Sequence, residues 1–586
     1  MKKSLYISLF AAGALLLGSC EDLDIKSGSQ MDETTFWQTD THLKQGVMGA
    51  YNAIRSDWAF GFDFTLDQIT DLYDGQSPHS DIVRGVNFTS TSGSVQNYWT
   101  YLYEVVHRTN TVIRNVQTNC GPEVTESLKP QVIGEAKFMR AMAYFRMLNF
   151  WGGVPYYDET CIISQEFQNL SNPRETADVI RGHIIDDLND AVASLPVKWS
   201  DADYGRATKG AALALRGKVY LYNQEWEKAK NDFAEIVNNA STYGYELEGD
   251  FDALFRHYGT SHSPEIIFGI QGEFGATASA GLRVNSYIAS KSSIQLLGDD
   301  HMVPSPKYVD MFENNDGSTF KWSDAYPGHP EKITDAVDFR KKILRVAIDD
   351  KATEIVDYLD CDTAKVNAVY TSTRDPRLAA TVITPYSTYL GSTADKKPMM
   401  KWFVLVDAAK GGSPLSAANF MTSNSQGKNA YFCRKLLPTG NLNGDWNSGT
   451  YSPYEFPLIR YADVLLMLAE AYNELGDLNS AVTELNKVRA RVNMPGLNSG
   501  ASWLAVGSKD EMTQRIRNER AYELGGEGQR YFDLKRWGIL AESISDALTV
   551  YGELYYTREF QARQVTWPIP NVAIERNPNL VQNTGW

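Results

Sequence analysis

Histidine and cysteine, the residues that most zinc sites need, are scarce in this chain. It has 8 histidines and 5 cysteines among 586 residues. No HExxH motif, no pair of histidines at i, i+4 and no CxxC pair occurs, and zinc sites depend on such spacings. A GxSxG nucleophile motif and a GxxxxGK[ST] phosphate loop are also missing. The sequence therefore predicts no metal, no cofactor and no catalytic residue.

Basic residues are also fewer than acidic ones. Lysine and arginine total 56 against 72 aspartates and glutamates, a formal net charge of -16. Proteins that bind nucleic acid need basic residues to neutralise phosphates, so this balance argues against a nucleic-acid partner. Hydrophobic residues make up 43% of the chain, which is close to the globular average and excludes a disordered or collagen-like protein.

Long hydrophobic runs are limited to the N-terminus. After Lys2 and Lys3, an apolar stretch extends from Leu5 to Leu17 and is too short to span a bilayer. Residues 1–19 are therefore predicted to be a signal peptide. The run LGSC that ends at Cys20 resembles the lipobox of bacterial lipoproteins, which implies a lipid on Cys20; the alternative is an ordinary signal peptide with a chance cysteine.

Residues 20–30 form an acidic tether that begins Glu-Asp-Leu-Asp after Cys20. In Bacteroidetes such a run resembles a signal for export to the cell surface, and the alternative is a solvated linker. Pairing of the other four cysteines stays open, because disulfides are permitted outside the cytoplasm but free buried thiols are at least as compatible with the wide spacing. These cysteines are Cys120, Cys161, Cys361 and Cys433.

Helical periodicity dominates both ends of the chain. Apolar residues three and four apart predict amphipathic helices over 97–116 and 132–150, and Trp99 with Tyr103 forms a neighbouring stripe on the first. Segment 210–237 resembles a tetratricopeptide helix pair, with Gly217 allowing close approach and Phe233 filling the groove. The same template recurs at 469–488, with Ala469 in the place of Gly217. A large insertion therefore separates two helix pairs.

The insertion, roughly 240–450, is rich in Gly, Ser, Thr, Asn and Asp, which predicts loops with a few short strands. Within it, the run from Glu313 to Gly317 is interpreted as a turn, because Phe312 stands where an EF-hand would need an oxygen ligand. The charged run over 516–538 has spacings of three and four that favour ion pairs along and between helices over an active site.

Five blocks resemble the SusD/RagB family of Bacteroidetes outer-membrane lipoproteins. They are EAKFMRAMAYFRMLNFWGGVP (135–155), GRAT (205–208) with the helix that follows, PLIRYADVLLMLAEAYNELGD (457–477), the charged run (516–538) and PIPNVAIERNPNLVQNTGW (568–586). The resemblance implies a mainly α fold: a tetratricopeptide-like helix-pair scaffold, roughly 31–240 and 450–586, with a large loop-rich insertion and a few short strands. Residues 31–586 would then form one SusD-like domain.

The same resemblance implies a function. Members are not enzymes but cell-surface lipoproteins of the outer membrane, which bind nutrients, mostly oligosaccharides, and pass them to a SusC-like TonB-dependent transporter. This chain is therefore expected to be anchored through Cys20, to face outward and to bind an oligosaccharide. The alternatives are a peptide-binding member of the family or a surface glycan hydrolase, which needs only two suitably spaced carboxylates.

The family blocks are scaffold, so ligand contacts are sought in polar loops outside them. A sugar offers an apolar face to an aromatic ring and hydroxyls to carboxylates, amides and guanidinium groups. Trp322 is the best placed, because polar neighbours flank it within the insertion. Tryptophans inside the blocks, Trp151, Trp537 and Trp567, are assigned to the core. The candidate ligand-binding residues are Trp58, Asp71, Asp74, Arg84, Trp99, Trp322, Tyr326 and Trp446.

Overall fold

Four long helices open the computed structural model. They are α3 (Asp40–Ile54), α5 (Gly93–Thr118), α6 (Leu128–Trp151) and α8 (Ala177–Ser194), and α6 packs against both α5 and α8. The structure describes residues 36–75, 78–85, 87–162, 170–257, 259, 261–272, 281–290, 298, 300–349, 354–393, 397–407, 420–422, 429–440 and 451–586.

The ends of these helices follow from local chemistry. The side chain of Thr39 accepts a hydrogen bond from the backbone N–H of His42 and so caps α3, and Thr176 caps α8 in the same way. Helix α6 ends at Gly152, whose φ of +73° favours glycine. The helices predicted over 97–116 and 132–150 are confirmed as α5 and α6, and both are slightly longer than predicted.

The two predicted helix pairs are also present. The first is α9 (Lys209–Tyr222) with α10 (Trp226–Asn238), and the second is α18 (Tyr461–Glu474) with α19 (Leu478–Arg491). A Cβ on Gly217 would lie 2.6 Å from a ring carbon of Phe233, so the close approach of α9 and α10 requires glycine here. In the second pair Ala469 is fully buried. The small residues therefore act as the repeat pattern predicts.

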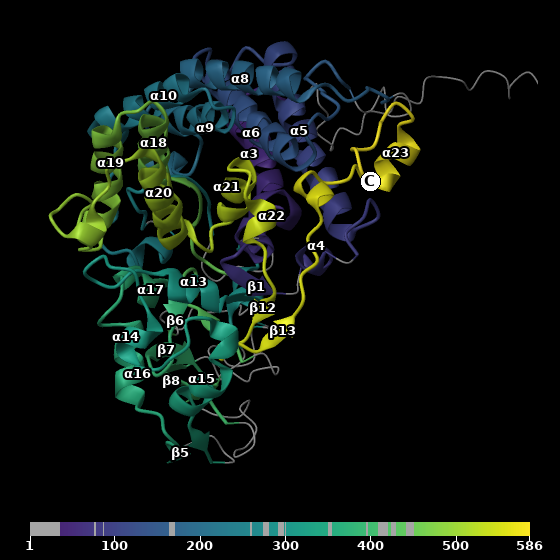
Figure 1. Ribbon diagram of the computed structural model, residues 1–586. Helices are drawn as coiled ribbons and strands as arrows, with labels where there is room; N and C mark the ends of the chain where they lie inside the picture. The colour runs from purple at the N-terminus through teal and green to yellow at the C-terminus, as the bar shows by residue number, and fades with distance from the viewer. Residues whose placement is uncertain are drawn as a thin grey trace, which may run out of the picture.

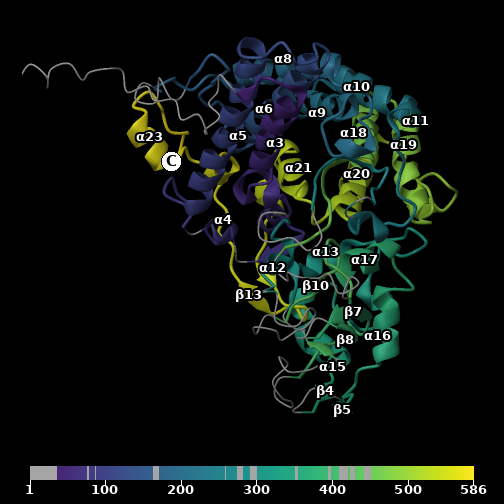
Figure 2. The ribbon, with the colours of Figure 1, turned by 180° about the vertical axis from the view of Figure 1, so that it is seen from behind.

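The pairs lie side by side in space although the insertion separates them in sequence. Helix α10 packs directly on α18, and Figures 1 and 2 show the two pairs as neighbours in one helical body. The two ends of the insertion lie side by side, because β2 (Ile266–Ile270) pairs antiparallel with β11 (Phe456–Arg460). This short ribbon returns the chain to the helical body. The fold is therefore mainly α, as predicted.

The insertion forms a lower lobe beneath the helical body (Figure 1). It contains short helices as well as the expected short strands, since short apolar runs in a polar segment can form either. Its largest described sheet has three strands in the order β7 (Thr388–Ser392), β8 (Pro398–Val404) and β9 (Phe420–Thr422). The lobe is tied to the N-terminal region where β1 (Tyr73–Gly75) pairs antiparallel with β3 (Met302–Pro304).

Shorter elements complete the described chain. The helices are α4 (Ser80–Arg84), α11 (Ala240–Tyr243), α12 (Val284–Ile288), α13 (Pro306–Met311), α14 (Trp322–Ala325), α15 (Val337–Leu344), α16 (Thr363–Tyr370), α17 (Pro376–Thr381), α20 (Lys509–Leu524), α21 (Arg530–Arg536), α22 (Leu540–Ser543) and α23 (Asn571–Arg576). The strands are β1 (Tyr73–Gly75), β3 (Met302–Pro304), β4 (Ala347–Ile348), β5 (Ile355–Asp357), β6 (Val382–Ile383), β7 (Thr388–Ser392), β8 (Pro398–Val404), β9 (Phe420–Thr422), β10 (Phe432–Cys433), β12 (Ala547–Leu548) and β13 (Leu554–Tyr556).

The charged run over 516–538 forms buried ion pairs, as predicted. Arg520 on α20 donates to Asp533 on α21 at 2.7 Å and to Asp463 on α18 at 2.7 Å. Glu523 and Glu527 both bind Arg460, which is 1% exposed. Buried carboxylates persist in the charged form when hydrogen-bonded cations neutralise them. The run therefore ties three helices and β11 together.

Aromatic side chains fill the core where the C-terminal segment crosses α6. Trp151 and Trp567 are fully buried, and Trp567 stacks on Phe150 with ring centroids 4.0 Å apart. Their assignment to the core is confirmed, whereas Trp537 is only partly buried and lies under Arg536. Among the described residues, no helix has the length and apolar character to cross a bilayer.

The same described residues contain no group of three potential metal ligands. Cys120, Cys361 and Cys433 are free thiols, and the last two are buried. Burial raises the pKa of Cys433, so this thiol stays protonated and packs as a small apolar side chain. The question of pairing that the spacing left open is therefore answered for these three cysteines, which form no disulfide with one another.

Candidate functional site

A pocket of about 780 Å³ opens between α5, the segment 155–161 that follows α6, and α23. Both views of the ribbon place α23 beside α5 (Figures 1 and 2), and the backbone N–H of Asn571 donates to the carbonyl of Ser90 at 2.9 Å. We call this the α5–α23 pocket. Its volume lies within the usual range for small-molecule sites.

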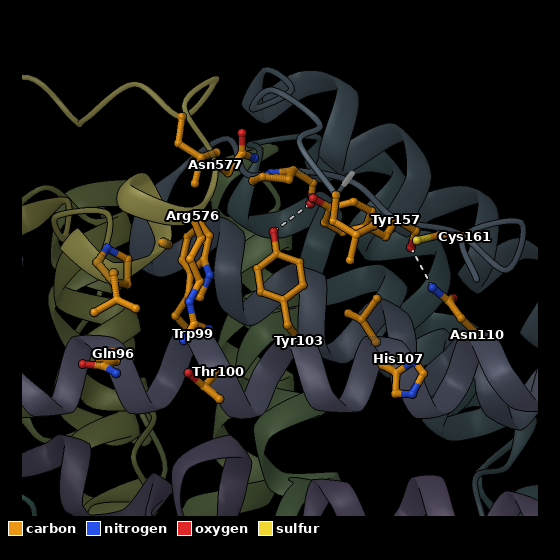
Figure 3. A pocket seen from close by; sticks show the side chains of 17 residues that line it. Gln96, Trp99, Thr100, Tyr103, His107, Asn110, Tyr157, Cys161, Arg576 and Asn577 are labelled. Carbon is orange, nitrogen blue, oxygen red and sulfur yellow. Dashed lines mark hydrogen bonds between the residues drawn. The ribbon is translucent and has the colours of Figure 1, made fainter. Parts of the chain in front are cut away.

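Aromatic rings form one side of the α5–α23 pocket. Trp99 and Tyr103 are one helical turn apart, so they project from the same face of α5, and Figure 3 shows both directed into the pocket. Their ring centroids lie 5.1 Å apart, and Tyr157 meets Tyr103 edge-on at 5.9 Å. The ring of Trp151 packs edge-on against that of Trp99, with ring centroids 5.1 Å apart. The rings are therefore held in fixed orientations.

Hydrogen bonds fix the deeper part of the same wall. The hydroxyl of Tyr103 donates to the carbonyl of Pro155 at 2.8 Å (Figure 3). Burial raises the pKa of Tyr103 well above its usual value, so the phenol remains neutral. Asn110 donates to the carbonyl of Tyr157 at 3.0 Å and accepts from Arg140 at 2.8 Å. These contacts hold the segment 155–161 against α5.

Neutral and basic polar groups line the rest of the pocket. Gln96, Thr100 and His107 are exposed along α5, and Arg576 is exposed at the end of α23. Amide, hydroxyl and guanidinium groups can bind the hydroxyls of a ligand. No aspartate or glutamate is present among the described lining residues. The pocket therefore combines flat apolar rings with hydrogen-bonding groups that carry no negative charge.

Of the predicted contact residues, Trp99 lies in this pocket and Trp58 does not. Trp58 is partly buried in the first turn after α3, where its ring meets Phe62, His79 and Tyr98 edge-on at 5.4–5.8 Å. Three such contacts are typical of a packing residue. The structure therefore separates two tryptophans that the sequence analysis had grouped in one site.

The acidic residues before α5 are buried in ion pairs. Asp71 accepts from Arg530 at 2.9 Å and 3.0 Å, and Asp74 accepts from Arg558. Burial would raise the pKa of Asp71, but the hydrogen bonds and charge of Arg530 hold it below its usual value. Burial raises the pKa of Asp74 to about 6, against the opposing effect of Arg558. Arg84 is exposed and lies over the ring of Tyr556 at 5.3 Å.

The structure contradicts the exposed platform expected at Trp322. Its side chain is only 6% exposed, its indole N–H donates to Asp310 at 2.9 Å, and Arg340 lies 4.6 Å from its ring. These partners, Asp310 and Arg340, lie outside the polar run that flanks Trp322 in the sequence, so that run did not indicate the environment of the ring. Tyr326 is partly buried, with Lys365 at 4.1 Å from its ring.

Two of the predicted residues, Trp446 and Cys20, lie outside the described residues. The sequence analysis in turn missed Tyr103, Tyr157 and Arg576 as pocket residues. The stripe of Trp99 and Tyr103 was visible on the predicted helix, but only Trp99 was named as a candidate ligand contact. Nothing in the local sequence pairs Tyr157 or Arg576 with that stripe, because tertiary packing alone brings them to α5.

Comparison with known proteins identifies the family. The model of the SusD family matches residues 264–586, more than half of the chain. A second family model, described as starch-binding and associating with the outer membrane, matches residues 22–221. A SusD-like protein of Formosa agariphila is 24% identical over 583 residues, covering 96% of this chain and 95% of its own.

Solved structures share the fold. A SusD-like protein of Bacteroides fragilis superposes with a TM-score of 0.71 at 23% identity, over 95% of this chain and 99% of its own. Surface glycan-binding protein A of Bacteroides thetaiotaomicron, solved with laminarihexaose, gives a TM-score of 0.62 at 19% identity, over 93% and 99% of the two chains. The helix-pair body, the buried charged run and these matches agree, and the chain belongs to the SusD family.

Proposed function

We propose that this protein is a cell-surface lipoprotein that captures oligosaccharides and passes them to a SusC-like TonB-dependent transporter in the outer membrane. Membership of the SusD family supports this role, as does the lipobox-like segment that ends at Cys20. The family model that matches the N-terminal part is described as associating with the outer membrane. Several acyl chains on one cysteine would hold the protein there stably.

The composition of the α5–α23 pocket is the observation that supports an oligosaccharide as the ligand. Trp99, Tyr103 and Tyr157 offer flat apolar surfaces for the C–H faces of sugar rings. The amide and guanidinium groups of Gln96 and Arg576 suit the hydroxyl rim of the same ring. A relative with the same fold is named a surface glycan-binding protein, which supports the same ligand class.

The pocket supports binding rather than turnover. Glycoside hydrolysis uses two carboxylates on either side of the scissile bond, and the described lining of the pocket offers none. Long incubation of the pure protein with oligosaccharides, followed by reducing-end analysis, tests this. Product that continues to accumulate beyond one equivalent of protein would show that the protein is a hydrolase.

The experiment for the ligand is a titration with laminarihexaose and maltoheptaose, monitored by isothermal calorimetry. Trp99→Ala is expected to weaken binding of the preferred oligosaccharide at least tenfold, about 1.4 kcal/mol, because it removes the largest of the three rings. Trp503→Ala is the matched control, since Trp503 is 47% exposed and does not line the pocket. Circular dichroism checks that helical content is unchanged in both variants.

Two results would contradict the assignment. Equal affinity of Trp99→Ala and wild type would remove the α5–α23 pocket as the sugar site. Saturable binding of peptides in the absence of any oligosaccharide binding would favour the peptide-binding alternative. The transporter is tested separately by detergent extraction and affinity purification from the native host, which should co-isolate a TonB-dependent barrel; recovery of the lipoprotein alone would argue against that partner.

A further inference from the structure

A second cavity, of about 300 Å³, lies between the segment before α9 and the β2–β11 ribbon. It shares no lining residue with the α5–α23 pocket. Aromatic side chains and one buried carboxylate stand out in its lining: Trp199, Tyr204, Tyr245, His262 and Glu455. We call it the Glu455 cavity.

The carboxylate of Glu455 is the unusual feature of this cavity. Glu455 directly precedes β11 and is 4% exposed. One oxygen accepts from the side-chain amide of Gln271 at 2.5 Å, and the other accepts from the hydroxyl of Tyr204 at 3.0 Å. Both donors favour the charged form. Burial opposes them and raises the pKa of Glu455 to about 7, so the group carries its negative charge at and above that pH.

No cation balances Glu455 within the part of the chain that the structure describes. A buried carboxylate without a counter-charge is costly, and most such groups are paired. Most other buried carboxylates of the described chain follow that rule; Glu135, for example, binds Arg206 at 2.5 Å, whereas Asp67 accepts from two backbone N–H groups. Glu455 departs from it, and it lies against a cavity with room for a ligand.

The carboxylate also has hydrogen-bonding capacity left. A carboxylate offers about four acceptor positions, whereas Gln271 and Tyr204 together supply two donors. The single hydroxyl proton of Tyr204 is shared between the two oxygens, at 3.3 Å and 3.0 Å. At least one acceptor position of Glu455 is therefore open to a further donor.

The rings around the cavity are held rigidly. The indole N–H of Trp199 donates to the carbonyl of Ala207 at 2.7 Å. Tyr204 stacks on His262 with centroids 3.4 Å apart, and the hydroxyl of Tyr245 lies 2.9 Å from that of Thr208. Aromatic faces attract ammonium groups as well as C–H groups. A carboxylate beside fixed rings is thus suited to a cationic ligand with an apolar body.

The other charges near the cavity do not oppose a cation strongly. Arg206 lies 3.8 Å from the ring centre of Trp199, but Glu135 and Asp203 neutralise it at 2.5 Å and 2.9 Å. At the rim, exposed Lys198 is balanced by exposed Asp201. The uncompensated charge in the described lining is therefore the negative charge of Glu455.

We propose that the Glu455 cavity binds the protonated amine of a small ligand of amino-sugar size, with Glu455 as the counter-ion and Trp199 and Tyr204 beside it. An ammonium group would supply both the missing positive charge and the missing hydrogen-bond donor. A volume of about 300 Å³ is at the lower end for ligand sites, which suits one or two sugar rings. This site does not depend on the α5–α23 pocket being the main glycan site.

The test compares a glucosamine trimer with its fully N-acetylated counterpart by calorimetry on the mature protein. The two ligands differ in charge and in the acetyl group, and only the first carries amines. We expect saturable binding of the glucosamine trimer and at least tenfold weaker binding by Glu455→Gln, which keeps the shape and removes the charge. Glu542→Gln, at an exposed position on α22, is the matched control for net charge and should bind as wild type does.

Three further measurements make the outcome decisive. Trp99→Ala should leave binding of the glucosamine trimer unchanged, which separates this site from the α5–α23 pocket. Lysine amide should compete with the trimer, because the ammonium group is the recognised element. If Glu455→Gln does not fold, Tyr204→Ala replaces it and should weaken binding at least threefold. Equal affinity for both trimers, or unchanged affinity in Glu455→Gln, would overturn the proposal.

Discussion

Arg460 is the residue at which a single substitution should test the buried charge network most directly. It stands at the end of β11 and is 1% exposed. Its guanidinium binds Glu527 at 2.7 Å, Glu265 at 2.5 Å and Glu523 at 2.7 Å. Arg460→Met keeps most of the side-chain length and removes the charge, so three buried carboxylates lose a shared partner.

The expected loss of stability depends on the ion pairs that remain in the variant. Arg491 still binds Glu265 and Glu523, at 3.0 Å and 2.6 Å. Lys435 still binds Glu527 at 2.5 Å, and Glu523 also keeps Arg377 at 3.1 Å, so each carboxylate keeps at least one cation. Breaking a buried ion pair from one side costs about 3–5 kcal/mol, and the remaining cations place the expected loss near the lower figure, about 3 kcal/mol.

Urea unfolding at pH 7, followed by tryptophan fluorescence and circular dichroism, measures this change in the free energy of unfolding. Arg108→Met is the control, because Arg108 forms an exposed i, i+4 pair with Glu104 and such pairs contribute less than about 1 kcal/mol. If Arg460→Met lost no more stability than Arg108→Met, the network would not stabilise the fold, and the charged run would need a functional explanation.

Three further predictions test the anchor, the insertion and a buried acid. Cys20→Ala should make the protein soluble in the native host, and fractionation with membranes in a strain without the transporter would refute lipidation. Trp322→Ala should lower the free energy of unfolding by about 3–5 kcal/mol, because it leaves a cavity at a buried position. Oligosaccharide affinity should stay at the wild-type value. A change in affinity without a loss of stability would show that Trp322 belongs to the ligand site. Burial raises the pKa of Glu455 to about 7 from an ordinary value of 4.5. Between pH 4.5 and about 7 the carboxyl is protonated in the folded protein but ionised in the unfolded chain, so the free energy of unfolding falls as pH rises through this window. Glu455→Gln removes that loss and should be more stable than wild type by about 3 kcal/mol at pH 8 and equally stable at pH 4, as measured by urea unfolding; a constant difference across pH would contradict the raised pKa.

Local patterns were enough to place the long helices and the helix pairs. The positions of Gly217 and Phe233 predicted a close helix crossing, and the glycine is needed there because a Cβ would overlap the ring. The charged run was assigned to ion pairs from spacing alone, and Arg520 with Asp533 confirms it. Both features join residues on consecutive helices that are close in the sequence, so their spacing can be read from the sequence directly.

The ligand contacts could not be predicted in the same way. Trp322 has polar neighbours in sequence, but in the structure its partners are Asp310 and Arg340, which the fold of the lower lobe brings to its ring. Exposure depends on what packs against a ring from distant segments. Sequence neighbours therefore gave the wrong environment for this tryptophan.

The sequence by itself determined the helical body, the close contact within each helix pair and the absence of the common zinc and phosphate motifs, because these follow from periodicity and residue type. Tertiary structure alone decided where the cavities lie. Trp99 shares a pocket with Tyr157 and α23 only because the segment after α6 and the C-terminal segment both lie against α5. Glu455 meets Tyr204, 251 residues away, only because the β2–β11 ribbon closes the insertion. Contacts between such distant positions depend on the packing of whole elements, which no local pattern encodes.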